Sequence, residues 1–263
     1  MAGARFDRVV LNRADLRRPF PAGFARRLRR QRVQVLTRRG KYLLAVLSSG
    51  DTLVMHLGMS GWLRAEPTAR KRRRPDRDAA LENRHDHVVF LMSSGMTVTF
   101  NDPRRFGVMD LVAAGGLDTH ASLGRMGPEP LSRDFDGTVL ARRCANRRIT
   151  LKTALLDQRI VAGIGNIYAS EALHLARLSP FRAAATIATA TGAPRPGAER
   201  LAAAIKTVLR RAIRLSDSDR YRASRFRVYD RDGDPCPTPG CRGVIARIWH
   251  AGRSTFYCRV CQR

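Results

Sequence analysis

Residues 236–261 read CPTPGCRGVIARIWHAGRSTFYCRVC, and this stretch decides the fold of the C-terminal part of the chain. It holds two close cysteine pairs, Cys236 with Cys241 and Cys258 with Cys261, and sixteen residues lie between the pairs. Pairs at this spacing bring four thiolates to the corners of a tetrahedron around one Zn²⁺ ion. We therefore predict a structural zinc site on a strand–turn–strand unit. Two disulfides are the alternative, but they are typical of secreted proteins, and the opening residues lack the apolar run of a signal peptide.

The turn of this unit is predicted at residues 250–254, HAGRS, and it carries a basic side chain, Arg253. If zinc holds the hairpin rigid, this turn points away from the metal and suits a DNA groove. The alternative is that zinc only fixes the C-terminal segment and that Arg253 is solvated. The fifth cysteine, Cys144, stands alone on an expected helix and is predicted to be a small core residue.

Upstream of the cysteines, residues 115–224 are predicted to be helical because apolar residues recur there at three- and four-residue spacing. The glycine-rich turn GIGN, at 163–166, opens one of these helices. Its glycines allow close backbone approach, and Asn166 can bond a phosphate oxygen or cap the helix. An ordinary turn between helices is the alternative. The expected helices span 134–144, 151–157, 167–178 and 198–215.

The N-terminal part, from Arg5 to Val112, has short strand-like segments separated by turn residues. This pattern predicts an antiparallel sandwich or barrel and, with the helices, an α+β protein. We expect three domains, at residues 1–114, 115–224 and 225–263. A polar insertion between Glu66 and Arg84 is predicted to be a mobile loop. The expected strands span 6–11, 33–36, 42–47, 52–56, 87–92 and 96–100.

Charge points to a polyanionic partner. The 263 residues include 49 Lys and Arg against 22 Asp and Glu, a formal net charge of +27. At 44% hydrophobic and 27% charged residues, the composition fits neither a disordered nor a membrane-spanning chain, so we expect a soluble, intracellular protein. Only four of the basic residues are lysines, and a position that kept lysine in this background is a candidate for an amine that must lose its proton.

A second candidate site lies at residues 101–107, NDPRRFG, where two guanidinium groups flank an aromatic ring on an expected turn. Arginine beside an aromatic ring can fill the gap that an extruded base leaves in a duplex. An Asp-Pro turn with solvated arginines is the alternative. Met59, between two glycines, reads as a core residue on its own, and residues 85–87, HDH, favour phosphate or structural hydrogen bonding over a metal pair. Neither a Walker-type phosphate loop nor a nucleophile-elbow serine is found.

Taken together, these segments resemble the bacterial formamidopyrimidine-DNA glycosylases and the related endonuclease VIII branch. The resemblance covers residues 3–263, nearly the whole chain, and its seven segments occur in the family's order: RRGKYLL (38–44), HLGMSG (56–61), HDH (85–87), DPRRFG (102–107), GPEPL (127–131), GNIYASE (165–171) and GRSTFYC (252–258). It implies an N-terminal antiparallel β-sandwich, a helical domain with a helix-two-turn-helix, and a C-terminal zinc-finger β-hairpin.

The resemblance also implies an activity, namely base-excision repair of double-stranded DNA that contains an oxidised base or an abasic site. The family excises oxidised purines such as 8-oxoguanine and formamidopyrimidines, and then nicks the strand by β- and δ-elimination. A monomeric enzyme of the bacterial cytoplasm, associated with the nucleoid and without a membrane partner, is implied. Its cofactor would be one structural Zn²⁺ ion.

Residue roles follow from the same resemblance, position by position. Lys41 matches the lysine that acts as an acid in β-elimination, and Arg253 the zinc-finger arginine linked to δ-elimination. Met59, Arg104 and Phe106 match the residues that fill the void left by the extruded base. Five positions match DNA contacts: His85, Arg104, Arg147, Lys152 and Asn166. The metal ligands implied are Cys236, Cys241, Cys258 and Cys261.

Two departures from the family bear on activity. The family's nucleophile is an N-terminal proline followed by glutamate, whereas this sequence opens MAGAR and matches the family only from Gly3. We expect that translation starts upstream and supplies the proline. Residues 215–224 are shorter than the family's segment that covers the flipped purine, which leaves lesion preference open, including a pyrimidine-lesion range. The competing hypotheses are a catalytically silent protein that binds damaged duplex DNA and a basic RNA- or ribosome-associated zinc protein.

Overall fold

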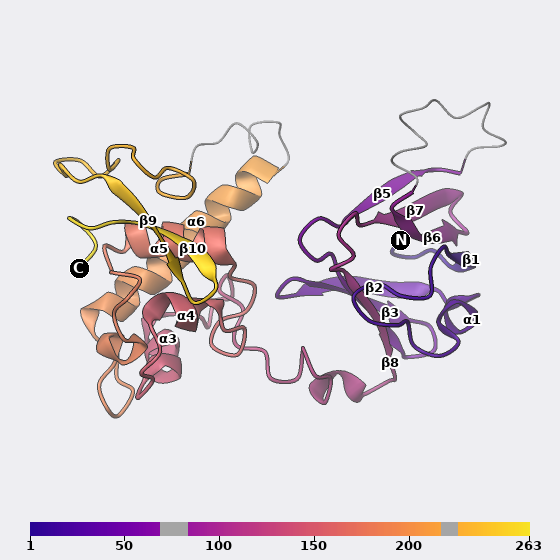
Figure 1. Ribbon diagram of the computed structural model, residues 1–263. Helices are drawn as coiled ribbons and strands as arrows, with labels where there is room; N and C mark the ends of the chain where they lie inside the picture. The colour runs from indigo at the N-terminus through magenta and orange to yellow at the C-terminus, as the bar shows by residue number, and fades with distance from the viewer. Residues whose placement is uncertain (69–83, 217–225) are drawn as a thin grey trace. The chain divides into compact units, whose positions relative to one another are not determined.

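The computed structural model describes residues 1–68, 84–216 and 226–263, and it divides into two compact units, Met1–Arg125 and Met126–Arg263 (Figure 1). Two sequence predictions fall mostly outside the described residues: the loop between Glu66 and Arg84, and the shortened segment at residues 215–224. No helix within the described ranges is long and apolar enough to cross a bilayer.

The first unit is a sandwich of two four-stranded antiparallel sheets, as expected (Figure 1). One sheet has the order β1-β6-β7-β5 and the other β2-β3-β4-β8. Apolar side chains from both sheets form one core, which includes Phe6, Leu53, Phe90 and Phe100. The strands are β1 (Phe6–Leu11), β2 (Val33–Arg39), β3 (Tyr42–Leu47), β4 (Thr52–His56), β5 (Trp62–Pro67), β6 (Asp86–Met92), β7 (Met96–Asn101) and β8 (Val108–Val112).

Three elements of this unit are absent from the sequence prediction: the short helix α1 (Phe24–Leu28) and the strands β5 and β8. Among the described strands, both lie at the edge of a sheet and pair on one side only. The β5 sequence, WLRAEP, carries two charged residues and ends in proline, so it has the composition of a loop. Edge strands tolerate such residues because half of their backbone groups need no partner strand.

The second unit is built around helices whose side chains share one apolar core. Asp136 and Thr150 cap the helices that follow them, since each side chain accepts a hydrogen bond from a backbone N–H of the first turn. Cys144 lies fully buried in this core, as predicted. The helices are α3 (Gly137–Cys144), α4 (Leu151–Leu156), α5 (Asn166–Leu175) and α6 (Pro196–Ser216), with the one-turn helix η2 (Ala184–Ile187) between α5 and α6. A further one-turn helix, η1 (Gly116–Asp118), belongs to the end of the first unit.

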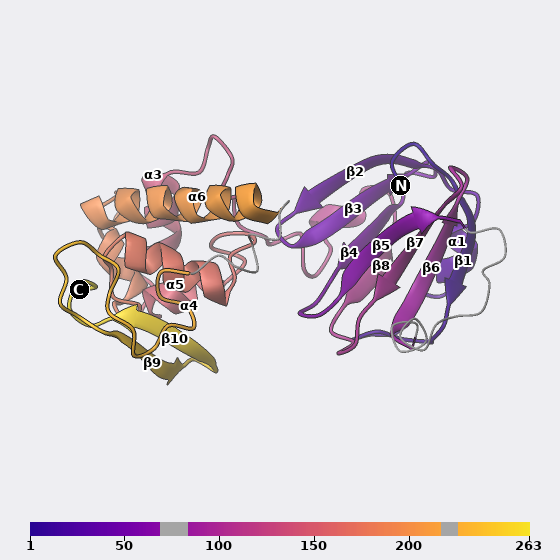
Figure 2. The same ribbon diagram turned by 90° about the horizontal axis from the view of Figure 1, so that it is seen from above.

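A two-stranded hairpin follows the helices, as predicted, with β9 (Ile245–His250) paired to β10 (Arg253–Cys258). Its two-residue turn has positive φ at both positions, 49° at Ala251 and 72° at Gly252, which matches the twist of the flanking strands. In both views the hairpin lies beside α4 and α5 of the same unit (Figure 2).

Candidate functional site

Three predicted site residues meet on one exposed corner of the sandwich. The guanidinium carbon of Arg104 lies 4.8 Å from the ring centroid of Phe106, and Arg104 Nη2 lies 3.6 Å from Met59 Sδ. Met59 is 69% exposed and Phe106 41% exposed. A flexible thioether, a planar cation and an aromatic ring thus form one surface that can enter a gap between stacked bases.

The core position that the residue pattern alone predicts for Met59 is therefore wrong. Gly58 has a φ of +72°, and a Cβ there would lie 2.6 Å from the carbonyl carbon of Phe106. The glycine backbone packs directly against the Phe106–Gly107 backbone, so the interior has no room for a side chain at this point. Met59, the next residue, lies on the exposed side of this packed backbone.

A buried carboxylate, Asp102, holds this corner together. Its side chain accepts a 2.6 Å hydrogen bond from Ser60 Oγ and a 2.7 Å bond from the Gly107 N–H. Ser60 belongs to the loop of Met59, and Gly107 follows Phe106, so one fully buried side chain fixes both loops. The importance of Asp102 and Ser60 was not evident in the sequence, where DP reads as an ordinary turn signal.

The HDH segment at residues 85–87 is hydrogen-bonded to the backbone of Asp102. The Asp102 N–H donates to the carbonyl of His85 (3.0 Å), and the buried His87 Nε2 lies 2.8 Å from the carbonyl oxygen of Asp102. Asp86 accepts from Asn101 Nδ2 at 2.8 Å. His87 and Asp86 therefore make structural hydrogen bonds, as expected, while His85 is half-buried at the edge of the corner.

Lys41 is exposed at the turn between β2 and β3, where Gly40 has a φ of +55°. Burial lowers the pKa of His56, and the charge of Lys41 lowers it further. His56 Nδ1 in turn accepts the Gly58 N–H at 3.0 Å, directly before Met59. Lys41 therefore acts electrostatically on the histidine that anchors the Met59 loop.

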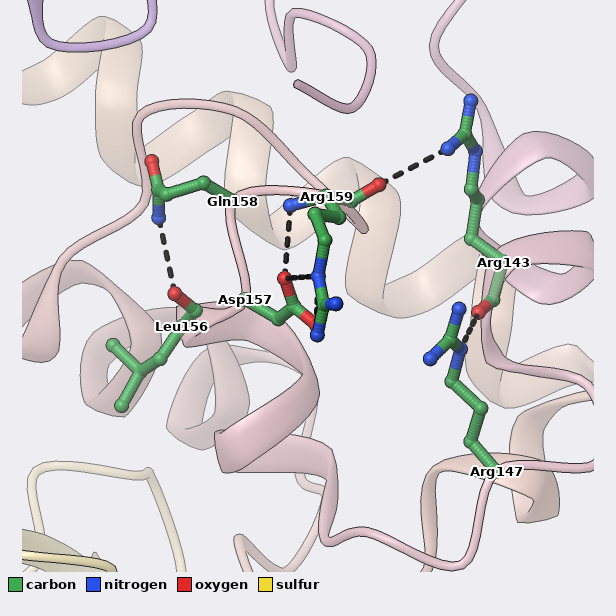
Figure 3. A network of polar contacts seen from close by, with 6 residues as sticks. All are labelled: Arg143, Arg147, Leu156, Asp157, Gln158 and Arg159. Atoms are coloured by element: carbon green, nitrogen blue, oxygen red, sulfur yellow. Dashed lines mark hydrogen bonds and ion pairs between the residues drawn. The ribbon is translucent and has the colours of Figure 1, made fainter. Parts of the chain in front are cut away.

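In the second unit, the glycine turn before α5 is closed by a residue that the sequence motifs did not single out, Gln158, whose bond to the Leu156 carbonyl is drawn in Figure 3. Gln158 Oε1 accepts the Gly163 N–H at 2.8 Å, and Gln158 Nε2 donates to the carbonyls of Ile164 (3.0 Å) and Leu156 (3.1 Å). One amide thus replaces the backbone bonds that the chain lacks between α4 and α5.

Arg147 belongs to a separate basic group beside this turn (Figure 3). Arg147 Nε donates to the Arg143 carbonyl (2.7 Å), and Arg143 Nη1 donates to the Arg159 carbonyl (3.0 Å). Arg159 also pairs with Asp157 at 2.7 Å. All three arginines are exposed and carry only one carboxylate among them in this network, so the group keeps a positive surface.

Lys152 and Asn166 converge on the hairpin. Lys152 Nζ donates to the Ser254 carbonyl (2.8 Å) and to Thr255 Oγ1 (2.6 Å), and Asn166 Nδ2 donates to the same Ser254 carbonyl (3.0 Å). Lys152 is 1% exposed. Burial, and then the charge of the neighbouring Arg253, lower the pKa of Lys152 to about 8. Arg253 itself is exposed at the turn, one residue from the doubly held carbonyl.

The four predicted metal-ligand cysteines do come together, since their Sγ atoms all lie within 4.8 Å of one another. Cys236 to Cys261 and Cys241 to Cys258 are each 3.7 Å apart. Sulfurs bound to one Zn²⁺ ion at about 2.3 Å in a tetrahedron lie about 3.8 Å apart, whereas a disulfide measures about 2.05 Å. Four thiolates at these distances can hold one metal ion.

A glycine shapes this cluster. A Cβ at Gly243 would lie 2.5 Å from Cys258 Sγ, so a larger residue would displace the sulfur. The Gly243 N–H also donates to Cys241 Sγ at 3.4 Å. Backbone N–H groups that donate to thiolates are typical of cysteine metal sites, and the donor set therefore fits a metal.

Glu171 ties α5 to the chain that leads into the cysteines, and the sequence analysis did not assign it this role. Its carboxylate accepts the N–H groups of Arg227 (2.8 Å), Val228 (2.8 Å) and Tyr229 (3.1 Å). A buried carboxylate that gathers three backbone donors replaces a helix or sheet as their partner. Its sequence signals were its place at the end of the GNIYASE segment and the presence of an acidic residue amid apolar neighbours on a helix.

Comparison with known proteins gives one consistent family. Residues 1–109 match the family model of the formamidopyrimidine-DNA glycosylase N-terminal domain, and residues 126–222 match that of the formamidopyrimidine-DNA glycosylase H2TH domain. The formamidopyrimidine-DNA glycosylase of Azorhizobium caulinodans is 50% identical over 276 residues, which cover 100% of this chain and 94% of the relative.

Solved structures agree. The MutM (Fpg) protein of Thermus thermophilus has a TM-score of 0.78 at 36% identity, covering 100% of this chain and 92% of that one. Lactococcus lactis Fpg in complex with FAPY-dG-containing DNA has a TM-score of 0.81 at 27% identity, covering 100% and 94%. The two family models match one unit each, and the sequence relative and the solved structures cover the whole chain. The chain therefore belongs to the formamidopyrimidine-DNA glycosylase family.

Proposed function

We propose that the protein is a DNA glycosylase with abasic-site lyase activity, which removes oxidised bases from double-stranded DNA and cleaves the strand. The observation that carries this proposal is the exposed corner of Met59, Arg104 and Phe106, held by the buried Asp102. Contacts to the DNA backbone alone require cations and hydrogen-bond donors, and they do not require exposed apolar side chains beside a guanidinium. Met59, Arg104 and Phe106 are called the wedge below. The relative from Lactococcus lactis was solved with damaged DNA of this class.

The wedge would occupy the space that an extruded base leaves. Phe106 and Met59 would replace the lost stacking, and Arg104 would bond to the base left without a partner. Extrusion costs least at a damaged or already weakened pair, so residues that stabilise the open duplex favour lesions over intact DNA.

For the chemistry we propose Lys41 as the acid in β-elimination and Arg253 as the residue that assists δ-elimination. Both side chains are exposed at the tip of a hairpin turn, where they can reach a bound strand. The charge of Lys41 lowers the pKa of His56, which lies next to the loop of Met59. Arg253 sits beside a backbone carbonyl fixed by two donors, which limits its mobility.

We propose His85, Arg104, Arg147, Lys152 and Asn166 as DNA-binding positions, of which the buried Lys152 acts through the hairpin. For Arg147 the support is its place in an exposed basic group. Lys152 and Asn166 contribute through the hairpin as well, because both hold the Ser254 carbonyl next to Arg253. Their effect on DNA therefore includes the orientation of the turn.

We infer that the metal is one structural Zn²⁺ ion, held by Cys236, Cys241, Cys258 and Cys261. When bound, it would rigidify the hairpin, and it supplies no reacting group. Separate apolar clusters in the sandwich, the helices and the finger support three domains, at residues 1–114, 115–224 and 225–263. We also propose that the protein is a monomer that works in the bacterial cytoplasm, at the nucleoid.

The test is covalent trapping. The protein, produced from its own gene and checked by intact mass, is incubated with borohydride and a duplex that bears either 8-oxoguanine or an abasic site. A trapped protein–DNA adduct on both duplexes, with strand cleavage, is the expected result. Salt-sensitive binding without any adduct would contradict the enzyme and favour a silent damage-binding protein.

A Lys41→Ala variant sharpens this test. If Lys41 is the acid, strand cleavage slows by about 100-fold or more while duplex affinity changes little. An unchanged cleavage rate would remove Lys41 from the mechanism. Preference for structured RNA over abasic duplex in the same binding assay would instead support an RNA-associated protein.

A further inference from the structure

A histidine that the proposed function does not use lies against the cysteine cluster. His174, in the last turn of α5, is 1% exposed. Its Nε2 atom lies 3.4 Å from Cys236 Sγ, 3.3 Å from Thr238 Oγ1 and 4.0 Å from Cys261 Sγ. It is not one of the four residues whose ligand atoms cluster mutually, so its role toward a metal is indirect.

The other side of the ring fixes its tautomer. Arg227 Nε donates to His174 Nδ1 at 3.4 Å. A guanidinium has no acceptor, so Nδ1 must present its lone pair, and in the neutral ring the proton then resides on Nε2. His174 is therefore a donor toward Cys236 Sγ and Thr238 Oγ1.

Thr238 continues the chain of hydrogen bonds. Its hydroxyl oxygen accepts from His174, and its proton is free to point at Cys261 Sγ, 3.7 Å away. A metal-bound cysteine is a thiolate and can only accept. Each hydrogen bond is therefore donated toward the cluster, from Arg227 to His174, from His174 to Thr238 and Cys236, and from Thr238 to Cys261.

The two halves of the cluster thus receive different support. Cys241 accepts a backbone N–H from Gly243, a neighbour in its own loop. Cys261 faces the Thr238 hydroxyl, and Cys236 faces both a backbone donor of Thr238 and the side chain of His174, which comes from a helix of the core. Side-chain donors can be removed by substitution without breaking the loop, so this half can be tested.

We propose that His174 and Thr238 are positioning residues of the metal centre, which donate hydrogen bonds to the thiolates of Cys236 and Cys261 and make these sulfurs slower to react and to release metal. The inference rests on the proposed metal and does not depend on glycosylase activity. A hydrogen bond to a thiolate withdraws charge from the sulfur lone pair, which lowers its nucleophilicity and raises the energy of its charge-transfer transition.

Two readouts test this in the full-length protein loaded with zinc or cobalt. The first is the rate at which peroxide releases zinc to a coloured chelator. The second is the thiolate-to-Co²⁺ charge-transfer band. His174→Leu should release zinc about tenfold faster and shift the band to longer wavelength. His174→Gln, which can place an N–H near the same point, should restore much of both properties.

The matched control is Ser170→Ala. Ser170 is equally buried on α5, and its hydroxyl donates to the Asn166 carbonyl and not to a sulfur. This variant should behave as the unaltered protein in both assays. If it changes them as much as His174→Leu does, the effect is general loosening of α5 and the inference is wrong.

Thr238→Val decides the matter if His174→Leu does not fold. Valine keeps the shape of threonine and removes the donor to Cys261, so the band should shift in the same direction by a smaller amount. An unmoved band and an unchanged release rate in Thr238→Val, or in a folded His174→Leu, would overturn the inference. Failure of the unaltered protein to bind either metal would refute the metal centre itself.

Discussion

Two regions are predicted to bind DNA: the wedge corner of the sandwich, formed by Met59, Arg104 and Phe106, and the hairpin junction of the helical unit, where Lys152 and Asn166 hold the β9–β10 hairpin. They differ in which of their residues are buried. Met59 and Phe106 are exposed, and a buried residue behind them, Asp102, holds them in place. Lys152 is buried and holds an exposed residue, Arg253, through its neighbour's carbonyl. The comparison teaches that a DNA-binding position can act by touching DNA or by fixing the residue that does.

Metal loss should have the largest effect, and it should be confined to the hairpin side of the comparison. In Cys258→Ser, one of four ligands is lost, and with it several of the about 10 to 16 kcal/mol that a structural Zn²⁺ supplies on binding. We expect zinc stoichiometry and duplex affinity to fall while the sandwich keeps its unfolding transition. Calorimetry and metal analysis measure this, and retained zinc with full affinity would contradict it.

Removal of the carboxylate behind the wedge should come next. Asp102→Ala leaves the Ser60 hydroxyl and the Gly107 N–H without their acceptor inside the protein. Each unsatisfied buried donor costs about 1 to 3 kcal/mol, so the loss of the acceptor for both should lower the free energy of unfolding by about 2 to 6 kcal/mol. Urea denaturation of the variant checks this, with the exposed Asp118→Ala as the neutral control. Equal stability of the two variants would mean that the corner does not depend on Asp102.

At the hairpin junction, we expect one substitution to change the stability of the protein and another, in the nearby basic group, to change the salt dependence of DNA binding. Lys152→Met removes the donor to Ser254 and Thr255 and should cost about 1 to 3 kcal/mol, with little change in how binding depends on salt. Arg147→Ala should do the opposite, because each lost phosphate contact makes the negative slope of log K against log salt shallower by about 0.9. Binding titrations at several salt concentrations decide. A slope change in Lys152→Met would mean that its amine contacts phosphate directly.

Lys152 also predicts a pH effect of modest size. Its pKa is lowered from 10.5 to about 8 in the folded protein, so between these values the unfolded chain binds more protons than the native one. The contribution of Lys152 to stability therefore rises with pH across this window, by at most about 1.4 kcal/mol per pH unit. The difference in unfolding free energy between the unaltered protein and Lys152→Met, measured from pH 7 to 10, should grow in favour of the unaltered protein. A flat difference would exclude this shift.

The wedge itself should matter least for stability. Phe106→Ala and Met59→Ala remove exposed side chains, so each should change the unfolding free energy by about 0.5 kcal/mol or less. The same variants should lose preference for abasic over intact duplex. Competition binding with the two duplexes measures that preference. Retained preference would show that these side chains do not enter the helix.

Periodicity predicted most of the fold, because the core strands and helices bury one regular face. The hairpin with its cysteines was also predicted, since ligand spacing constrains the chain more tightly than propensity does. Edge strand β5 was missed because its half-exposed residues show no such face. The contacts of Asp102, Gln158, Glu171 and His174 could not be predicted, because each joins segments that are distant in sequence or bonds to backbone groups, which no side-chain pattern records.

Helix α5 has a consequence for which changes the protein can accept. Asn166 holds the hairpin, Glu171 holds the chain entering the finger, and His174 faces the sulfurs, all within about 12 Å of helix. Inserting one residue between the first and last of them would rotate everything beyond it by about 100° and advance it by about 1.5 Å. All attachments on one side of the insertion would then lose their targets together. This helix should therefore tolerate substitution at its other positions far better than any change in length.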